Sequence, residues 1–319
     1  MPSERIGSIR GHSIGPVASF DGTELHVEVL GNGPTVVLAH GFCMDIPSWH
    51  YTLKELSSEY RFVAYCQRGH GLSARAPTDD YTMEALARDL EVVIGEVWEG
   101  EPLVVLGHSM GGMGLIKYCG MFPAQLGERV RAVGLIDTCA ARVIDGMLPE
   151  GAVIAKPALA LIEEAALRAA RRNPDAFDRI RRARADLVRI MVRLMGFGER
   201  APAYKIEFVQ KMMSRLAPDV LVWIVQEMRA MDLAECLDEI DIPALIVVGT
   251  RDRLTPVRAS RQMAVAIPNA ELITIPGSGH MPMLEQPKQF HARLRTFLEN
   301  PGAVYQGRRI GALPQLAPD

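Results

Sequence analysis

Short, nearly continuous apolar runs recur along the chain, and each is rich in β-branched side chains. Such runs are typical of strands that are buried on both faces of a parallel sheet. Asp21 and Gly22, a pair that favours a tight turn, separate VASF from ELHVEVLG. They predict a hairpin of two strands that precedes the apolar runs in the sequence. We predict core strands within TVVLAHGF (35–42), RFVAYC (61–66), PLVVLGHS (102–109), VRAVGLIDT (130–138), PALIVVGTRD (243–252) and AELITIP (270–276).

Segments with helical spacing alternate with these runs. Residues 47–59, 81–99 and 287–300 are predicted helices, and the second of them spaces its apolar side chains three and four residues apart. Strands that alternate with helices predict an α/β fold with a doubly wound, mostly parallel sheet. The apolar positions of the second helix are Met83, Leu86, Leu90, Val93 and Val97.

One long segment breaks the alternation. Residues 141–235 hold several amphipathic helical stretches and no convincing strand, which indicates a helical cap inserted into the sheet domain. The predicted organisation is therefore an N-terminal extension (1–16), the first part of the core (17–140), the cap (141–235), the second part of the core (236–299) and an irregular tail (300–319).

Composition narrows the class of protein. The 319 residues are 48% hydrophobic and 23% charged with a net charge of −3, which fits a globular protein and argues against nucleic acid as a partner. The start has no apolar stretch of signal-peptide length, and no run approaches the roughly 18 apolar residues that span a bilayer, so we expect a cytoplasmic protein without stable membrane insertion. The five scattered cysteines are expected to be reduced thiols. The sequence leaves open whether the protein forms a homo-oligomer.

A glycine-flanked serine follows one of the predicted strands. In the order Gly107-His108-Ser109-Met110-Gly111, it stands between the run at 102–109 and a helix-like segment, which is the strand-turn-helix setting of a nucleophile elbow. Glycines give room where a strained serine brings backbones close together. A plain tight turn into a helix is the alternative interpretation.

A serine nucleophile needs a base and an acid, and both follow it in the sequence. His280 lies on a glycine-flanked loop after the run at 270–276, so we predict it as the base, while other histidines sit inside glycine motifs or helices. Asp252 ends the preceding run and is the preferred acid, with Asp137 at the end of the run at 130–138 as its rival. Backbone N–H groups of Phe42 and Met110 are the predicted oxyanion donors.

These motifs resemble the α/β-hydrolase superfamily. HGF, QRGHGLS, GHSMGG, GTRDRLTP and GSGHMPMLEQP occur in the order found in that family, and the resemblance covers Val17 to Glu299. It implies a triad of Ser109, Asp252 and His280, with residues 141–235 as a lid. Cys66 departs from the family pattern, since related sequences often have Asp there; we expect altered hydrogen bonding at that position and no nucleophilic role.

The resemblance implies hydrolysis of carboxylic esters through an acyl-enzyme. Dehalogenases and epoxide hydrolases of the family have Asp where Ser109 stands, so their chemistry is disfavoured. Lactone or C–C bond hydrolysis, perhydrolysis and a non-turnover binding protein remain as alternatives. We expect no metal or organic cofactor, because a triad is self-sufficient and the histidines lack paired ligand spacing.

The methionines and the cap suggest the kind of substrate. Many of the sixteen methionines lie in the cap or beside the motifs, where they would line an adaptable pocket for an apolar acyl chain, although ordinary core packing is the alternative. The basic stretches at 168–172 and 179–186 are interpreted as a solvated face, with attraction of anionic substrates or lipid surfaces as the sharper alternative. The expected partner is therefore a small-molecule acyl ester.

Overall fold

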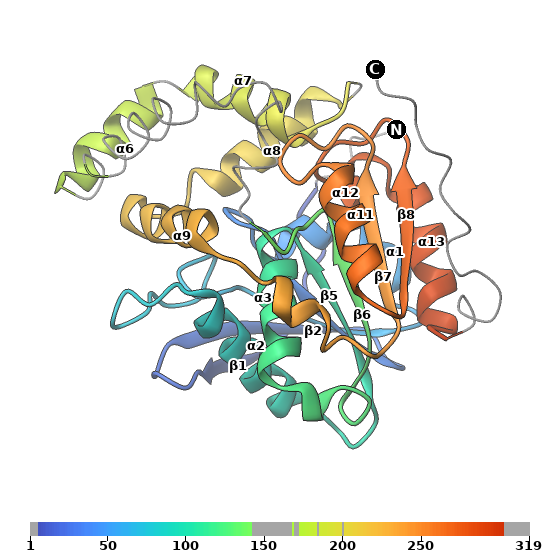
Figure 1. Ribbon diagram of the computed structural model, residues 1–319. Helices are drawn as coiled ribbons and strands as arrows, with labels where there is room; N and C mark the ends of the chain where they lie inside the picture. Colours follow the sequence, from blue (N-terminus) through green and yellow to red (C-terminus); the bar gives the residue numbers. More distant parts are fainter. Residues whose placement is uncertain (1–5, 142–167, 169–171, 184, 200, 303–319) are drawn as a thin grey trace.

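The computed structural model describes residues 6–141, 168, 172–183, 185–199 and 201–302. A single eight-stranded sheet has the order β1-β2-β4-β3-β5-β6-β7-β8. The two outer pairings, β1 with β2 and β2 with β4, are antiparallel, and every other pairing is parallel (Figure 1). The predicted fold class, an α/β protein with a mostly parallel sheet, is confirmed.

The strands lie within or beside the predicted runs. Each core strand ends one to three residues before its apolar run does, because the last residues of the run form the loop beyond the sheet. The strands are β1 (His12–Ala18), β2 (Glu24–Leu30), β3 (Thr35–Ala39), β4 (Arg61–Tyr65), β5 (Leu103–His108), β6 (Val130–Ile136), β7 (Ala244–Gly249) and β8 (Ala270–Ile275).

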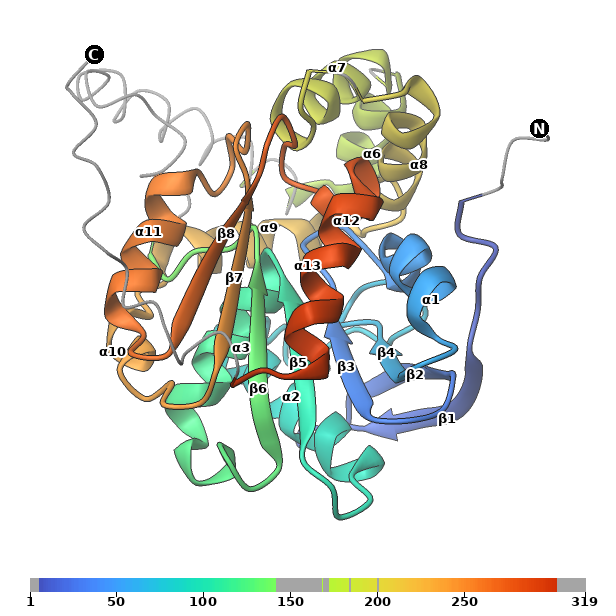
Figure 2. The ribbon, with the colours of Figure 1, turned by 90° about the vertical axis from the view of Figure 1, so that its right-hand side faces the viewer.

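Helices cover both faces of the sheet, and the alternation of side chains along β5 shows how. Val105 points to the face covered by α2, α3 and α11, whereas Val104 and Leu106 point to the face covered by α1 and α13 (Figure 2). All three side chains are buried, which explains the uninterrupted apolar run. The helices are η1 (Ile46–Trp49), α1 (His50–Leu56), α2 (Met83–Val97), α3 (Met110–Met121), η2 (Pro123–Gln125), α11 (Val257–Ala266), α12 (Pro282–Glu285) and α13 (Pro287–Glu299).

The described residues between β6 and β7 form helices and no strand. They are α6 (Pro174–Ala183), α7 (Ala185–Gly196), α8 (Ala203–Met213), α9 (Pro218–Ala230) and α10 (Ala234–Leu237), and α6 to α9 lie beyond the carboxyl ends of the parallel strands (Figure 1). Residues 142–167 of the predicted cap and 303–319 of the predicted tail lie outside the described residues. In the described part of the chain, no helix has both the length and the apolar character required to cross a bilayer.

Candidate active site

Ser109 occupies the corner between β5 and α3. Its φ of 50° and ψ of −119° are rare for a residue with a side chain, and its backbone N–H donates to the oxygen of Ile136 at 2.9 Å. A Cβ on Gly111 would lie 2.4 Å from the backbone oxygen of Ala39, and one on Gly107 would lie 2.7 Å from Cα of Gly112. The glycines around Ser109 are therefore required by close backbone contacts.

Three predicted side chains form one hydrogen-bonded row at this corner. Nε2 of His280 lies 2.9 Å from Oγ of Ser109, and Nδ1 of His280 lies 2.9 Å from Oδ2 of Asp252. A carboxylate on Nδ1 favours the tautomer with its proton there, which leaves Nε2 free to accept the Ser109 hydroxyl proton. The three side chains are buried. The arrangement is that of a nucleophile, a base and an orienting acid, and their catalytic roles stay predictions at this point.

Asp252 is surrounded by hydrogen-bond donors. Its Oδ1 accepts from the backbone N–H groups of Leu254 at 2.8 Å and Thr255 at 3.1 Å, and its Oδ2 accepts from the Thr255 hydroxyl at 2.7 Å. Burial opposes ionisation, but the adjacent His280 and these hydrogen bonds hold the pKa of Asp252 below its usual value. Asp252 is therefore an anion beside the imidazole.

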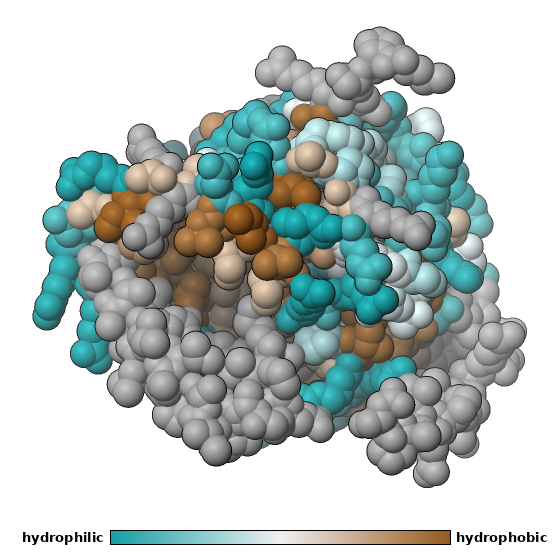
Figure 3. Space-filling model, turned by 90° about the horizontal axis from the view of Figure 1, so that it is seen from above, coloured by the Kyte–Doolittle hydropathy of each residue, from teal (hydrophilic) through white to brown (hydrophobic). Residues whose placement is uncertain are grey.

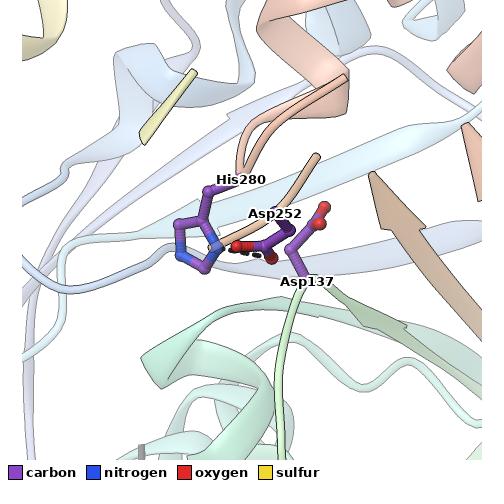
Figure 4. Close-up of side chains that lie close together, drawn as sticks. All are labelled: Asp137, Asp252 and His280. Atoms are coloured by element: carbon purple, nitrogen blue, oxygen red, sulfur yellow. Dashed lines mark hydrogen bonds and ion pairs between the residues drawn. The ribbon is translucent and has the colours of Figure 1, made fainter. Parts of the chain in front are cut away.

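Asp137, the rival acid, lies beside this row but not on the ring nitrogen. Its Oδ1 accepts from the backbone N–H of Gly249 at 2.9 Å. Figure 4 shows its carboxyl group next to that of Asp252, whose oxygens face His280. The structure thus brings both acids to one place, and Asp252 is the one bonded to the imidazole.

Two backbone N–H groups are available near Ser109 as the predicted oxyanion donors. Met110 is the first residue of α3, where N–H groups have no partner within the helix, and Phe42 lies on the loop after β3. Among the described residues, neither N–H group donates a hydrogen bond to a backbone oxygen. A Cβ on Gly41 would lie 3.2 Å from Cβ of Ser109, so the Phe42 loop approaches the serine closely.

Two buried histidines fix the loop that carries Phe42. Nε2 of His40 accepts from the backbone N–H of Gln67 at 2.9 Å, and Nε2 of His70 accepts from the backbone N–H of Cys43 at 3.2 Å. Each Nδ1 then donates to a backbone oxygen. Burial lowers the pKa of His40 to about 3 and that of His70 to about 4, so both rings are neutral at physiological pH. Their environment accounts for both histidines as structural groups.

An apolar cavity of about 500 Å³ opens next to Ser109 and His280. Its described lining comes from the loops after β3, β7 and β8, from the corner between β5 and α3, and from α3, α7, α8 and α9. Arg229 is the only charged side chain in that described lining. Figure 3, which views this end of the molecule, shows apolar residues gathered around a hollow. Seven methionines line the cavity: Met44, Met113, Met191, Met195, Met213, Met228 and Met281.

Cys66 is an inert thiol at its position before the QRGHG segment. It is buried in a core cluster, and burial raises its pKa to about 11. A thiol in that state is protonated at neutral pH and is a poor nucleophile. All five cysteines are free thiols.

The described residues contain one group of side chains close enough to share a metal ion. Asp137, Asp252 and His280 each offer a ligand atom within 4.8 Å of the others. Asp252 and His280 already satisfy one another through a hydrogen bond, and His280 turns its other nitrogen to Ser109. We therefore interpret the group as a proton-handling cluster.

A family described as alpha/beta hydrolase matches residues 36–293 of this chain. Among curated proteins, the pimeloyl-(acyl-carrier protein) methyl ester esterase of Nitrosomonas europaea is 26% identical over 269 residues, which are 83% of this chain and 96% of that protein. "Probable oxidoreductase EphD" of Mycobacterium bovis is 42% identical over 105 residues, which are 32% of this chain and 18% of that protein. The match of this chain thus spans less than a fifth of the length of that relative.

Solved structures have the same architecture over almost the whole chain. A thermophilic esterase from Thermogutta terrifontis superimposes with a TM-score of 0.73 at 25% identity, covering 91% of this chain and 99% of that one.

Proposed function

The chain belongs to the alpha/beta hydrolase family, and from this premise we propose that it is a serine hydrolase that cleaves carboxylic esters with an apolar acyl group. The single observation that carries the proposal is the hydrogen-bonded row from Ser109 through His280 to Asp252 beside an apolar cavity. The esterases named among the similar proteins support the choice of reaction.

The proposed reaction begins with attack of Ser109 Oγ on the acyl carbon. Nε2 of His280 takes the hydroxyl proton, and the carboxylate of Asp252 balances the charge of the imidazolium. The carbonyl electron pair moves onto its oxygen, which accepts hydrogen bonds from the N–H groups of Phe42 and Met110. Each such donor is worth about 3 kcal/mol in the transition state of related chemistry.

Collapse of this intermediate breaks the ester bond. The leaving alkoxide takes the proton from His280 and departs as the alcohol, which leaves the acyl group on Ser109. Water then gives a proton to His280 and attacks the acyl carbon. The second intermediate releases the carboxylic acid as Ser109 regains its proton, so no cofactor takes part in the balance.

The cavity supports an apolar acyl group of moderate length. Its volume of about 500 Å³ falls within the range of about 300–1,000 Å³ that is usual for small-molecule sites. Methionine side chains adapt to flexible apolar ligands because they are unbranched and polarizable. We accordingly propose the segment 141–235, through α7, α8 and α9, as the cap over the acyl chain.

The test is hydrolysis of p-nitrophenyl esters from acetyl to palmitoyl by the wild type, Ser109→Ala and Ser58→Ala. Ser58 is an exposed serine on the turn after α1 and serves as the matched control. We expect turnover in the wild type and Ser58→Ala, loss in Ser109→Ala, and an acyl adduct on Ser109 by intact-mass and peptide analysis. Undiminished turnover in Ser109→Ala, or an adduct on another residue, would overturn the proposal. Absence of both turnover and adduct would favour C–C bond hydrolysis or ligand binding.

A further inference from the structure

Asp137 is fixed at the junction of β6 and β7 by backbone contacts. Its N–H donates to the oxygen of Val247 at 2.8 Å, and its Oδ1 accepts from the N–H of Gly249 at 2.9 Å. Its φ of 42° lies in the left-handed region, and its side chain is fully buried. The neighbouring strand therefore holds this carboxyl group where β7 leads into the Asp252 loop.

The carboxyl group of Asp137 is close to a second buried acid. One carboxyl oxygen of Asp137, one of Asp252 and one ring nitrogen of His280 lie within 4.8 Å of one another. Figure 4 shows the three side chains. Oδ2 of Asp137 is buried and accepts no hydrogen bond from an N–H or O–H group of the described residues. Two buried carboxyl groups at this separation do not both ionise, because like charges repel strongly where water is excluded.

The surrounding donors decide which of the two acids keeps its proton. Asp252 accepts from the imidazole of His280, from one hydroxyl and from two backbone N–H groups, whereas the one group of the described residues from which Asp137 accepts is the N–H of Gly249. Hydrogen bonds to a carboxylate favour its charged form. Asp252 is therefore the better-stabilised anion.

The charged groups around Asp137 also favour its protonated form. Within the described part of the chain, the groups that act on the charge of Asp137 are Asp252 and Glu285, both acids, while His280 is hydrogen-bonded to Asp252. Burial first, and then the negative charge of Asp252, raise the pKa of Asp137 well above its usual value. Asp137 is accordingly neutral at physiological pH, and a proton on Oδ2 makes that oxygen a donor.

From this geometry we infer that Asp137 is a positioning residue, whose neutral carboxyl group donates a hydrogen bond to the Asp252 carboxylate and holds that carboxylate against His280. The kinetic part of the inference rests on the proposed function, and the protonation state does not. The proton stays on Asp137 throughout turnover. Its hydrogen bond restricts rotation of Asp252, so that the anion faces Nδ1 when His280 becomes positively charged.

Two substitutions separate a neutral donor from an ionised acid. Asp137→Asn keeps a donor toward Asp252 and an acceptor toward Gly249, and Asn tolerates a left-handed backbone. We expect Asp137→Asn to retain kcat within about threefold. Asp137→Ala is expected to lower kcat about 10–100-fold with KM unchanged, which is the usual loss when a residue that orients a functional side chain is removed. Asp252→Asn removes the anion itself and lowers kcat by about 10⁴-fold.

The pH profile supplies a readout that a purely structural role would not move. In Asp137→Asn a neutral group replaces a neutral group, so the acid limb of kcat/KM keeps its midpoint. Removal of an ionised Asp137 would instead move that limb to lower pH by about one unit or more, because the imidazolium would lose a stabilising charge. Such a shift, or a loss of kcat as large as that of Asp252→Asn, would overturn the inference, as would full activity of folded Asp137→Ala.

A measurement that needs no turnover tests the protonation state directly. At neutral pH, infrared difference spectra of wild type against Asp137→Asn are expected to contain the C=O stretch of one protonated carboxylic acid. The matched control, Asp241→Asn, removes an exposed carboxylate before β7 and is expected to lack this band. Absence of the band for Asp137 overturns the inference even if the protein proves to be an esterase, and its presence supports the inference even if it does not.

Discussion

The side chain of His108 hydrogen-bonds to the backbone oxygen of His280, with 2.8 Å between Nε2 and that oxygen. A carbonyl oxygen only accepts, so Nε2 of His108 carries the hydrogen. Burial lowers the pKa of His108 to about 3, and the ring is neutral. His108, the residue before Ser109, therefore holds the loop that carries His280. The end of β5 thus positions both Ser109 and His280.

Replacement of His108 is expected to disturb that loop. His108→Leu removes the donor and leaves the oxygen of His280 buried without it, which costs about 1–3 kcal/mol of stability. His108→Gln retains an N–H donor of similar reach. We expect kcat of the Leu variant to fall about tenfold, a cost comparable to one lost hydrogen bond, while the Gln variant stays closer to wild type. Equal ester hydrolysis by the two variants would rule out this positioning role.

Two glycines allow a matched test of whether a Cβ atom can be accommodated. Gly111→Ala would push a Cβ to 2.4 Å from the backbone oxygen of Ala39, whereas a Cβ on the exposed Gly95 of α2 meets nothing within 4 Å. We expect Gly111→Ala to be poorly folded or inactive. Gly95→Ala is expected to raise the free energy of unfolding by about 0.5–1 kcal/mol, because alanine favours a helix interior. Urea unfolding and ester hydrolysis of both variants check the contrast.

The two acids show how far the sequence alone could go. Asp137 and Asp252 both follow apolar runs, so each was a reasonable partner for His280. The order of strands is absent from a single sequence, and it is the pairing of β6 with β7 that brings both carboxyl groups to one place. The sequence therefore predicted side chains that the structure brings together, and the hydrogen-bond donors around Asp252 distinguish its environment from that of Asp137.

The sequence also failed to predict α11, the start of β1 and the positions of several methionines. α11 was not predicted, and only Ser260, Met263 and Ala264 of its residues are buried. β1 begins at His12, inside the predicted extension. Of the methionines in the predicted cap or beside the motifs, four pack in the core instead of lining the cavity, since the direction of their side chains depends on tertiary packing. These four are Met110, Met212, Met231 and Met283.

Buried histidines away from the row predict acid lability. Burial lowers the pKa of His291, whose Nε2 lies 3.2 Å from Oγ1 of Thr52, to about 4. The unfolded chain, with a histidine pKa of about 6.5, binds the proton first as pH falls. The stability linked to His291 is thus complete above about pH 6.5 and is lost from there down to about pH 4, at up to 1.4 kcal/mol per pH unit.

Removing this histidine should flatten the pH dependence of stability. We expect the free energy of unfolding of His291→Gln to fall less steeply than that of wild type between about pH 6 and pH 5, by roughly 1 kcal/mol per pH unit. His12→Gln replaces an exposed histidine of β1 and is expected to leave the slope unchanged. Urea titrations at several pH values measure all three slopes, and identical slopes for wild type and His291→Gln would contradict the linkage.

The apolar cavity predicts a change in chain-length preference. Met228 of α9 lines it, so Met228→Trp should fill part of the space that an acyl chain would occupy. We expect kcat/KM for octanoyl esters to fall about 10–200-fold, with acetyl esters nearly unaffected, because lost contact with even one methylene costs about 1–3 kcal/mol. Val265→Trp introduces the same side chain at a position that is 80% exposed on α11 and should leave both values unchanged. An equal loss on short and long esters would mean that the acyl chain does not bind beside α9, because a blocked chain site discriminates by length whereas damage to Ser109 or His280 does not.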